Sequence, residues 1–244
     1  MTDRSPAGRR FLGGLKEVLL VVLGALIISA LLRAFVFEPF TIPSGSMQNT
    51  LQVNDKVVAQ KITDFKRGDV IVFSDPGQWV TGTGTGRTNP AAKALEFIGV
   101  LPNSSEDFLT KRVIGLPGDR VKCCDAEGRV TVNGAALDEG EYLYADAAGP
   151  VRPSEMEFEV VVPRNHLFVL GDHRNASADS RCHMDGPSAT NAFVPTDYVV
   201  GAVGMIVAPF ERWQQLHTPE VFAGIPQPEG DAPTAPEIIV ASHC

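Results

Sequence analysis

Residues 43–51 read Pro-Ser-Gly-Ser-Met-Gln-Asn-Thr-Leu and separate two parts of the chain that differ in character. Before them lies a long apolar run, and after them short segments rich in β-branched residues alternate with turns. In an extended segment Ser44 and Ser46 would point to the same side, because side chains repeat every two residues. One hydroxyl could then attack a carbonyl while the other donates a hydrogen bond to the oxyanion. An ordinary polar turn explains a bare Ser-Gly-Ser as well, so the surrounding sequence has to decide.

The apolar run before the serines predicts a membrane anchor. No charge occurs from Val18 to Leu32, and the run continues past Arg33 to Phe37. As a helix, residues 18–37 would span about 30 Å, which matches the hydrocarbon thickness of a bilayer. Residues 1–17 are basic, and such a flank predicts a cytoplasmic N-terminus and an exported body. Its charged residues before position 17 are Arg4, Arg9, Arg10 and Lys16 against Asp3 alone.

Two alternatives to an anchor remain. A cleaved signal peptide has a similar length and a basic flank, but it needs small residues at the third and first positions before the cut. A cut after Ala30 would place Ile28 at the third position, and a cut after Ala34 would place Leu32 there. Neither place therefore offers two small residues. A buried soluble helix is the other alternative, although few core helices carry so long an uncharged run.

The sequence after the serines predicts a β-rich body over residues 38–217. Short β-branched segments are separated by glycines, and Asn133-Gly134 is typical of a tight hairpin turn. Residues 75–108 contain a Thr-Gly repeat typical of a surface loop, and the proline-rich residues 218–244 show no periodic pattern, which predicts a disordered tail. The predicted strands are Asp55–Ala59, Asp69–Phe73, Thr110–Ile114, Arg120–Cys123, Arg129–Val132, Phe158–Val162 and His166–Leu170.

The charge balance excludes one class of partner. The formal net charge is −8, whereas binding to nucleic acid needs a basic face. The sequence predicts no metal site, because no Cys-x-x-Cys spacing typical of a zinc site is present.

A lysine in the body could activate one of the serines. A serine hydroxyl is a poor nucleophile until a base takes its proton, and a neutral lysine can be that base. The pKa of lysine, about 10.4 in solution, would have to fall by roughly 2–3, which burial can impose. If Leu109, Lys111 and Val113 share one face of a strand, Lys111 enters the core side. The alternative is a lysine on an edge strand that faces water.

Four motifs in order resemble bacterial type I signal peptidases, a family of Ser/Lys proteases. They are the serine stretch at 43–51, Gly68–Phe73, Lys111–Asp119 and Gly171–Arg181, and the resemblance covers roughly residues 15–205. It implies a single N-terminal transmembrane helix followed by an exported, all-β catalytic body. Gln48-Asn49, His173 and Asn175-Ala176 depart from the usual pattern, but none of these departures removes a proposed catalytic group.

The resemblance also implies roles for individual residues. Ser46 matches the nucleophile and Lys111 the general base, while Ser44 would donate its hydroxyl to the oxyanion beside the Ser46 N–H. Ser177 matches the serine that hydrogen-bonds and orients the lysine amine. The other matches are Asp179 with Arg181 as a charged pair that braces the site, Arg112 and Asp172 as further structural charges, and Phe40, Ile42, Leu109 and Thr110 as the lining of shallow pockets for small residues.

The implied activity is removal of signal peptides from exported preproteins after Ala-X-Ala sites, at the bilayer and without a cofactor. A self-cleaving Ser/Lys repressor would instead be soluble with a DNA-binding head, which the apolar run excludes. A catalytically silent, membrane-tethered β-domain that binds exported peptides is the alternative from another class. A Ser46–His173–Asp179 triad is a further option for the chemistry.

The cysteines suggest a disulfide on the exported side. We expect Cys123 or Cys124 to pair with Cys182, and Cys244 to remain unpaired at the end of the tail.

Overall fold

The structure is a computed structural model that describes residues 6–62, 64–76, 79, 89–91, 108–184 and 189–241. Most of the predicted loop at 75–108 and Cys244 lie outside this part, as do the side chains of Arg4, Arg9 and Arg10. The helices are α1 (Pro6–Phe35) and the short 3-10 turns η1 (Gly45–Met47), η2 (Arg174–Ala176), η3 (Ser180–His183), η4 (Ala189–Ala192), η5 (Thr196–Tyr198), η6 (Phe210–Arg212) and η7 (Glu220–Phe222). The strands are β1 (Phe37–Thr41), β2 (Lys56–Gln60), β3 (Val70–Ser74), β4 (Phe108–Gly115), β5 (Arg120–Cys123), β6 (Val130–Val132), β7 (Ala135–Ala136), β8 (Ala145–Asp146), β9 (Gly149–Pro150), β10 (Phe158–Val161), β11 (His166–Leu170), β12 (Val194–Pro195), β13 (Val199–Ala208), β14 (Gln214–Gln215) and β15 (Glu237–Val240).

The larger sheet carries the serine turn and the lysine strand. Its strand order in the described part of the chain is β1-β2-β13-β3-β4-β11-β12, with β14 added beside β13. The pairings along this order are antiparallel, which fits the predicted all-β body. All seven predicted strands are confirmed with small shifts at their ends. The ten-residue strand β13 was not predicted, although it joins β2 to β3.

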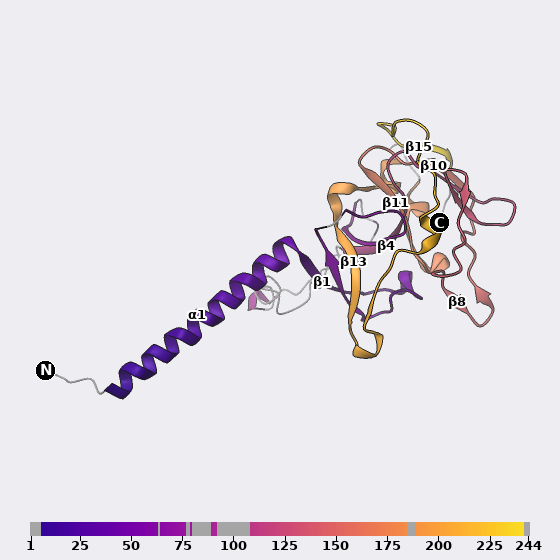
Figure 1. The fold of residues 1–244 in the computed structure, drawn as a ribbon. Coiled ribbons are helices and arrows are strands. Elements are labelled where there is room, and N and C mark those ends of the chain that lie inside the picture. The colour runs from indigo at the N-terminus through magenta and orange to yellow at the C-terminus, as the bar shows by residue number, and fades with distance from the viewer. Residues whose placement is uncertain are drawn as a thin grey trace.

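A second sheet packs against the first (Figure 1). Its order is β15-β10-β5-β6-β7, and Asn133-Gly134 forms the predicted tight turn between β6 and β7. Both turn residues have positive φ, of 52° and 81°, a conformation that asparagine and glycine tolerate. The main core lies between the sheets, where Ile114 and Phe168 of the first meet Val121 and Phe158 of the second.

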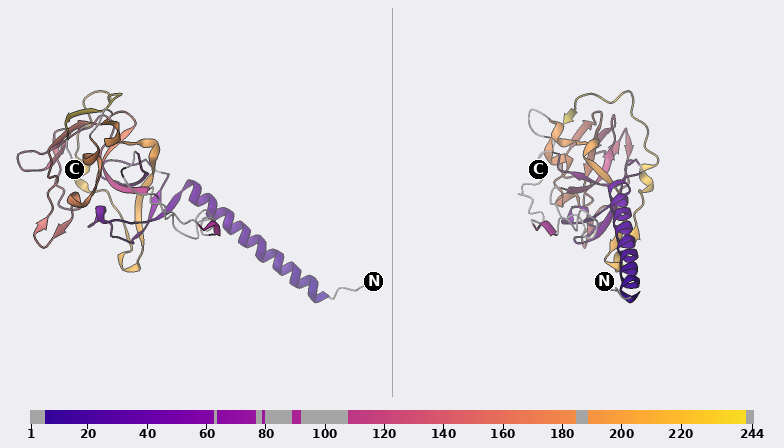
Figure 2. Two further views of the ribbon diagram at one scale, coloured as in Figure 1. Left: turned by 180° about the vertical axis from the view of Figure 1, so that it is seen from behind. Right: turned by 90° about the vertical axis from the view of Figure 1, so that its left-hand side faces the viewer.

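The helix α1 projects away from this body, and Figures 1 and 2 show it from three sides. It begins at Pro6 and ends at Phe35, and β1 starts at Phe37, so the predicted anchor at 18–37 is helical except at its end. Over the described residues, no helix meets both the length and the apolarity required to cross a membrane. A transmembrane role for this segment therefore stays a prediction.

The prediction of a disordered tail is wrong for residues 218–241. The strand β15 pairs with β10 at the edge of the second sheet, and Phe222 and Ile225 are buried in the main core. A φ of +87° at Gly68 and its missing side chain leave room for the Phe222 ring, whose Cδ2 would lie 2.4 Å from a Cβ at this position. Tertiary packing thus orders a segment that has no periodic pattern of its own.

The predicted disulfide between Cys123 or Cys124 and Cys182 is wrong as well. Cys123 is bonded to its neighbour Cys124, and Cys182 is also disulfide-bonded. The physical reason is position: Cys123 ends β5 in the second sheet, whereas Cys182 lies in η3 beside the Ser177 carbonyl.

Candidate active site

Ser46 lies in the one-turn helix η1, which follows β1 at the edge of the larger sheet. Met47 and Leu51 are buried and anchor the turn, and the Leu51 N–H donates to the Met47 carbonyl at 2.8 Å. Ser44 precedes the turn with an extended backbone. The turn therefore holds Ser46 in a fixed position, and its side chain is only 8% exposed.

Lys111 approaches Ser46 from β4. Its Nζ lies 2.6 Å from Ser46 Oγ, although the two residues are 65 positions apart in the chain. Leu109 and Val113, which share its face of the strand, pack in one apolar cluster with residues of β3 and β11. The expectation that the lysine enters the core side is therefore confirmed, and Lys111 is 3% exposed.

The surroundings of Lys111 favour its neutral form. Burial lowers its pKa from 10.5 to about 8, because water no longer solvates the ammonium. The carboxylates of Asp179 and Asp172 oppose this shift, and Arg181 adds to it. An amine with a pKa of about 8 is neutral for an appreciable fraction of the time near neutral pH, as a general base requires.

The two other serines differ in how they contact this pair. The Ser44 hydroxyl lies 3.4 Å from Ser46 Oγ, so it is beside the atom that would attack. The Ser177 hydroxyl is buried, but the described residues supply it with no hydrogen-bond partner. The predicted hydrogen bond between Ser177 and the Lys111 amine is thus not formed, because the amine is directed at Ser46 Oγ instead.

Asp179 and Arg181 form the predicted charged pair. Arg181 Nε and Nη2 each donate to the Asp179 carboxylate at 2.8 Å, and both residues are buried. Burial alone would raise the Asp179 pKa, but the charge and hydrogen bonds of Arg181 outweigh it and lower that pKa. The same carboxylate accepts the Gly171 N–H at 3.0 Å. The pair therefore fixes the segment after β11 and keeps a negative charge near Lys111.

Arg112 and Asp172 form a second buried pair on the other face of β4. Arg112 donates twice to Asp172, at 2.8 and 2.6 Å, and once to the Gly68 carbonyl at 2.6 Å. Thr50 donates to the same carboxylate, which ties the end of the serine stretch to this pair. Removing one partner of such a pair would leave an uncompensated buried charge.

A shallow cleft opens beside Ser46 and Lys111. Three of the four predicted pocket residues line it: Ile42, Leu109 and Thr110. The fourth, Phe40, is buried in the core and packs edge-on against Phe108, which itself lines the cleft. Phe40 therefore supports the cleft from behind.

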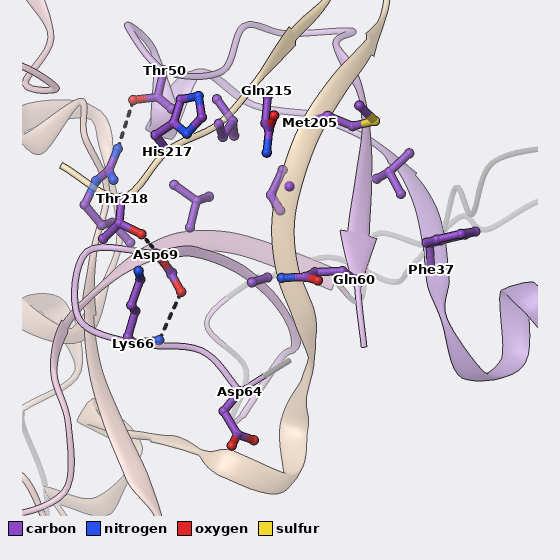
Figure 3. A pocket seen from close by; sticks show the side chains of 17 residues that line it. Phe37, Thr50, Gln60, Asp64, Lys66, Asp69, Met205, Gln215, His217 and Thr218 are labelled. Carbon is purple, nitrogen blue, oxygen red and sulfur yellow. Dashed lines mark hydrogen bonds between the residues drawn. The ribbon is translucent and has the colours of Figure 1, made fainter. Parts of the chain in front are cut away.

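A larger cavity of about 770 Å³ lies elsewhere, beside the second charged pair (Figure 3). It is lined by Arg112 and Thr50 together with residues of β2 and β13 and the segment from Gln215 to Thr218. Neither Ser46 nor Lys111 reaches it, since Lys111 and Arg112 point to opposite faces of β4. In the described residues, no group of three His, Cys, Asp or Glu side chains could hold a metal ion.

The alternative triad of Ser46, His173 and Asp179 is not assembled. The His173 ring faces Gln48 and stacks on Tyr144, while Asp179 binds Arg181. The contact of His173 with Gln48 and the serine turn was not predicted from the sequence, nor was the buried pair of Arg174 and Glu139. Gln48, His173 and Arg174 lie inside the motifs, which was the available signal, whereas Glu139 lies outside all four.

Comparison with known proteins shows which family the chain resembles. The sequence profile of the family described as "Signal peptidase, peptidase S26" matches residues 15–208. A "Probable signal peptidase I" of Mycobacterium leprae (strain TN) is 37% identical over 209 residues, which cover 73% of this chain and 71% of that protein. A "Signal peptidase I" of Mycobacterium tuberculosis (strain ATCC 25618 / H37Rv) is 35% identical over 225 residues, or 82% of this chain and 74% of that protein. A crystal structure of a signal peptidase I from Enterococcus faecalis V583 is 23% identical, covers 58% of this chain and 97% of that chain, and gives a TM-score of 0.34.

Proposed function

Because the chain belongs to the signal peptidase family, peptidase S26, we propose that it cleaves signal peptides from exported preproteins with a Ser46/Lys111 dyad. The observation that carries this proposal is the 2.6 Å contact between Lys111 Nζ and Ser46 Oγ in a buried site. A lysine with a pKa of about 8 and a serine at this distance can transfer a proton directly.

The reaction follows from this arrangement. Neutral Lys111 takes the proton from Ser46 Oγ, which attacks the carbonyl carbon of the residue before the scissile bond. The Ser46 N–H and the Ser44 hydroxyl donate to the oxyanion, and the lysine ammonium returns its proton to the leaving amine. Lys111 then deprotonates a water molecule that hydrolyses the acyl-enzyme and releases the signal peptide.

The specificity for Ala-X-Ala belongs to the same proposal. The cleft beside Ser46 is shallow and bounded by Ile42 and Leu109, and a shallow apolar recess accepts a small side chain more readily than a long one.

Cleavage of a purified preprotein tests this function. We expect the full-length chain in detergent to cut a preprotein after an Ala-X-Ala site, with the new N-terminus identified by mass spectrometry. A matched preprotein with leucine in place of the last alanine should be cut at least tenfold more slowly, because three extra carbon atoms must be accommodated. Binding of both preproteins without cleavage of either would favour the catalytically silent, peptide-binding domain.

We further propose that α1 anchors the catalytic body at the outer face of the cell membrane. The six consecutive residues Val18–Leu23 are each at least half exposed, and at 100° per residue they point in every direction around the helix. An exposed helix that is apolar all round is typical of a membrane span. Phe210 and Trp213 in the β13–β14 turn are 88% and 62% exposed, which suits a body close to the lipid surface.

The orientation has its own test. A protease added to spheroplasts should degrade the body and leave a protected fragment that ends near Phe37, since the basic flank favours a cytoplasmic N-terminus. Immunoblotting with a tag at the N-terminus detects that fragment, and lysed spheroplasts are the control. Protection of residues 40–244 would show the reverse orientation.

A further inference from the structure

His173 is held against the serine turn by three groups. Its ring stacks on Tyr144 with the ring centres 3.9 Å apart. Its Nδ1 lies 2.8 Å from Gln48 Oε1 and 3.3 Å from the Gly45 carbonyl oxygen. Both oxygens are acceptors, so the hydrogen on the imidazole must sit on Nδ1. The tautomer of His173 is therefore set by the serine turn.

His173 and Gln48 also bind the backbone on either side of Ser46 through their own N–H groups. The His173 N–H donates to the Ser46 carbonyl at 3.0 Å, and the Gln48 N–H donates to the Gly45 carbonyl at 3.0 Å. Together with His173 Nδ1, these contacts fix the orientation of two consecutive peptide groups, Gly45–Ser46 and Ser46–Met47.

The first of these peptide groups matters for catalysis, because it contains the Ser46 N–H. A trans peptide is planar, and its N–H points in the direction opposite to its C=O. Fixing the Gly45 carbonyl toward His173 and Gln48 therefore directs the Ser46 N–H away from them. Rotation of this peptide group would move the N–H without moving Lys111.

We propose that His173 and Gln48 are positioning residues that aim the Ser46 N–H at the oxyanion. This inference rests on the proposed function, in which that N–H stabilises the tetrahedral intermediate. An oxyanion contact strengthens only in the transition state, so its misalignment lowers kcat and leaves KM nearly unchanged. His173 does not touch the reacting atoms, and Lys111 remains the base.

Three substitutions at one position test the inference. Asparagine places an amide N–H one bond from Cγ, where Nδ1 of histidine stands, whereas glutamine places it one bond further out. We expect His173→Ala and His173→Gln to lower kcat about tenfold, less than the 10²–10³ for complete loss of an oxyanion donor, with KM within twofold. His173→Asn should recover most of the activity.

The pH profile separates positioning from acid–base chemistry. In all three variants the rising limb of kcat should keep the midpoint of the unmodified protein, because Lys111 is untouched.

Gln48→Leu combined with His173→Ala should lower kcat little more than either change alone, since both act on one peptide group. A matched control is His166→Ala, because Nδ1 of His166 also faces a backbone carbonyl, that of Arg164, at 2.8 Å. We expect kcat of this variant to be unchanged.

The outcomes distinguish this inference from the proposed function. If the unmodified protein cleaves and His173→Asn is as impaired as His173→Ala, the positioning role is wrong. A change in KM alone, or a shifted pH limb, would also overturn it. If the unmodified protein cleaves no preprotein, it is the proposed function that fails.

Discussion

Replacing Lys111 with alanine is expected to abolish preprotein cleavage, with kcat reduced by about 10⁴-fold or more. The amine is 2.6 Å from the Ser46 hydroxyl, and the variant would leave that hydroxyl without a base. Ser46→Ala should have the same effect, because it removes the proposed nucleophile. Single-turnover cleavage in detergent measures the loss, and thermal unfolding tests whether the variants remain folded.

A histidine at position 111 tests whether distance or pKa matters more. The pKa of histidine, near 6.5, suits a general base, but its ring is shorter and wider than the lysine chain. We expect Lys111→His to be nearly inactive, because geometry precedes pKa in proton transfer. Retained activity in Lys111→Ala together with its loss in His173→Ala would overturn the dyad and favour the histidine triad.

The pH dependence of the unmodified protein gives an independent check on Lys111. Its folded pKa is lowered to about 8, and in the proposed mechanism the neutral amine is the active form. Activity should therefore be low below pH 7 and should rise with pH through about 8. A midpoint above pH 10 would mean that the lysine is solvated as in water.

The sequence predicted the strands well because their β-branched residues carry a local signal. It missed β13, whose glycines at positions 201 and 204 dilute that signal. Gly201 is needed there for packing, since a Cβ would lie 2.1 Å from the Gln60 carbonyl oxygen of β2. The order of the tail depends on Gly68 and on the edge of β10, neither of which is near it in the chain.

Site residues that belong to a family motif were predicted from the sequence. Residues whose role comes from a contact between two motifs were not. Ser46 and Lys111 were identified from the resemblance, and the structure brings them together. Gln48 and His173 are 125 positions apart, so their hydrogen bond has no local pattern. Both stood at departures from the family's usual sequence, and the structure shows that these two departures contact each other.

Gly171 offers the second prediction of large effect, because it lies where three segments of the site converge. It follows β11, its N–H binds Asp179, and its carbonyl accepts Arg174 Nε at 2.9 Å. A Cβ at this position would lie 2.3 Å from Ser177 Oγ and 2.5 Å from the Ser46 carbonyl oxygen. These distances are shorter than van der Waals contact. An alanine at position 171 therefore cannot be accommodated unless Ser177 and the backbone of Ser46 move.

We therefore expect Gly171→Ala to lower kcat about 100-fold, because displacing the backbone of Ser46 by about 1 Å spoils the alignment of its hydroxyl with Lys111. The free energy of unfolding should also fall by about 1–3 kcal/mol, as for other overpacked sites. Adding Ser177→Ala should not restore activity, since the overlap with the Ser46 carbonyl remains. The matched control is Gly204→Ala in β13, where an added Cβ meets nothing within 4 Å. If Gly171→Ala cleaves preprotein as fast as Gly204→Ala, the Ser46 turn can shift without loss of catalysis, and its fixed position is not what the chemistry requires.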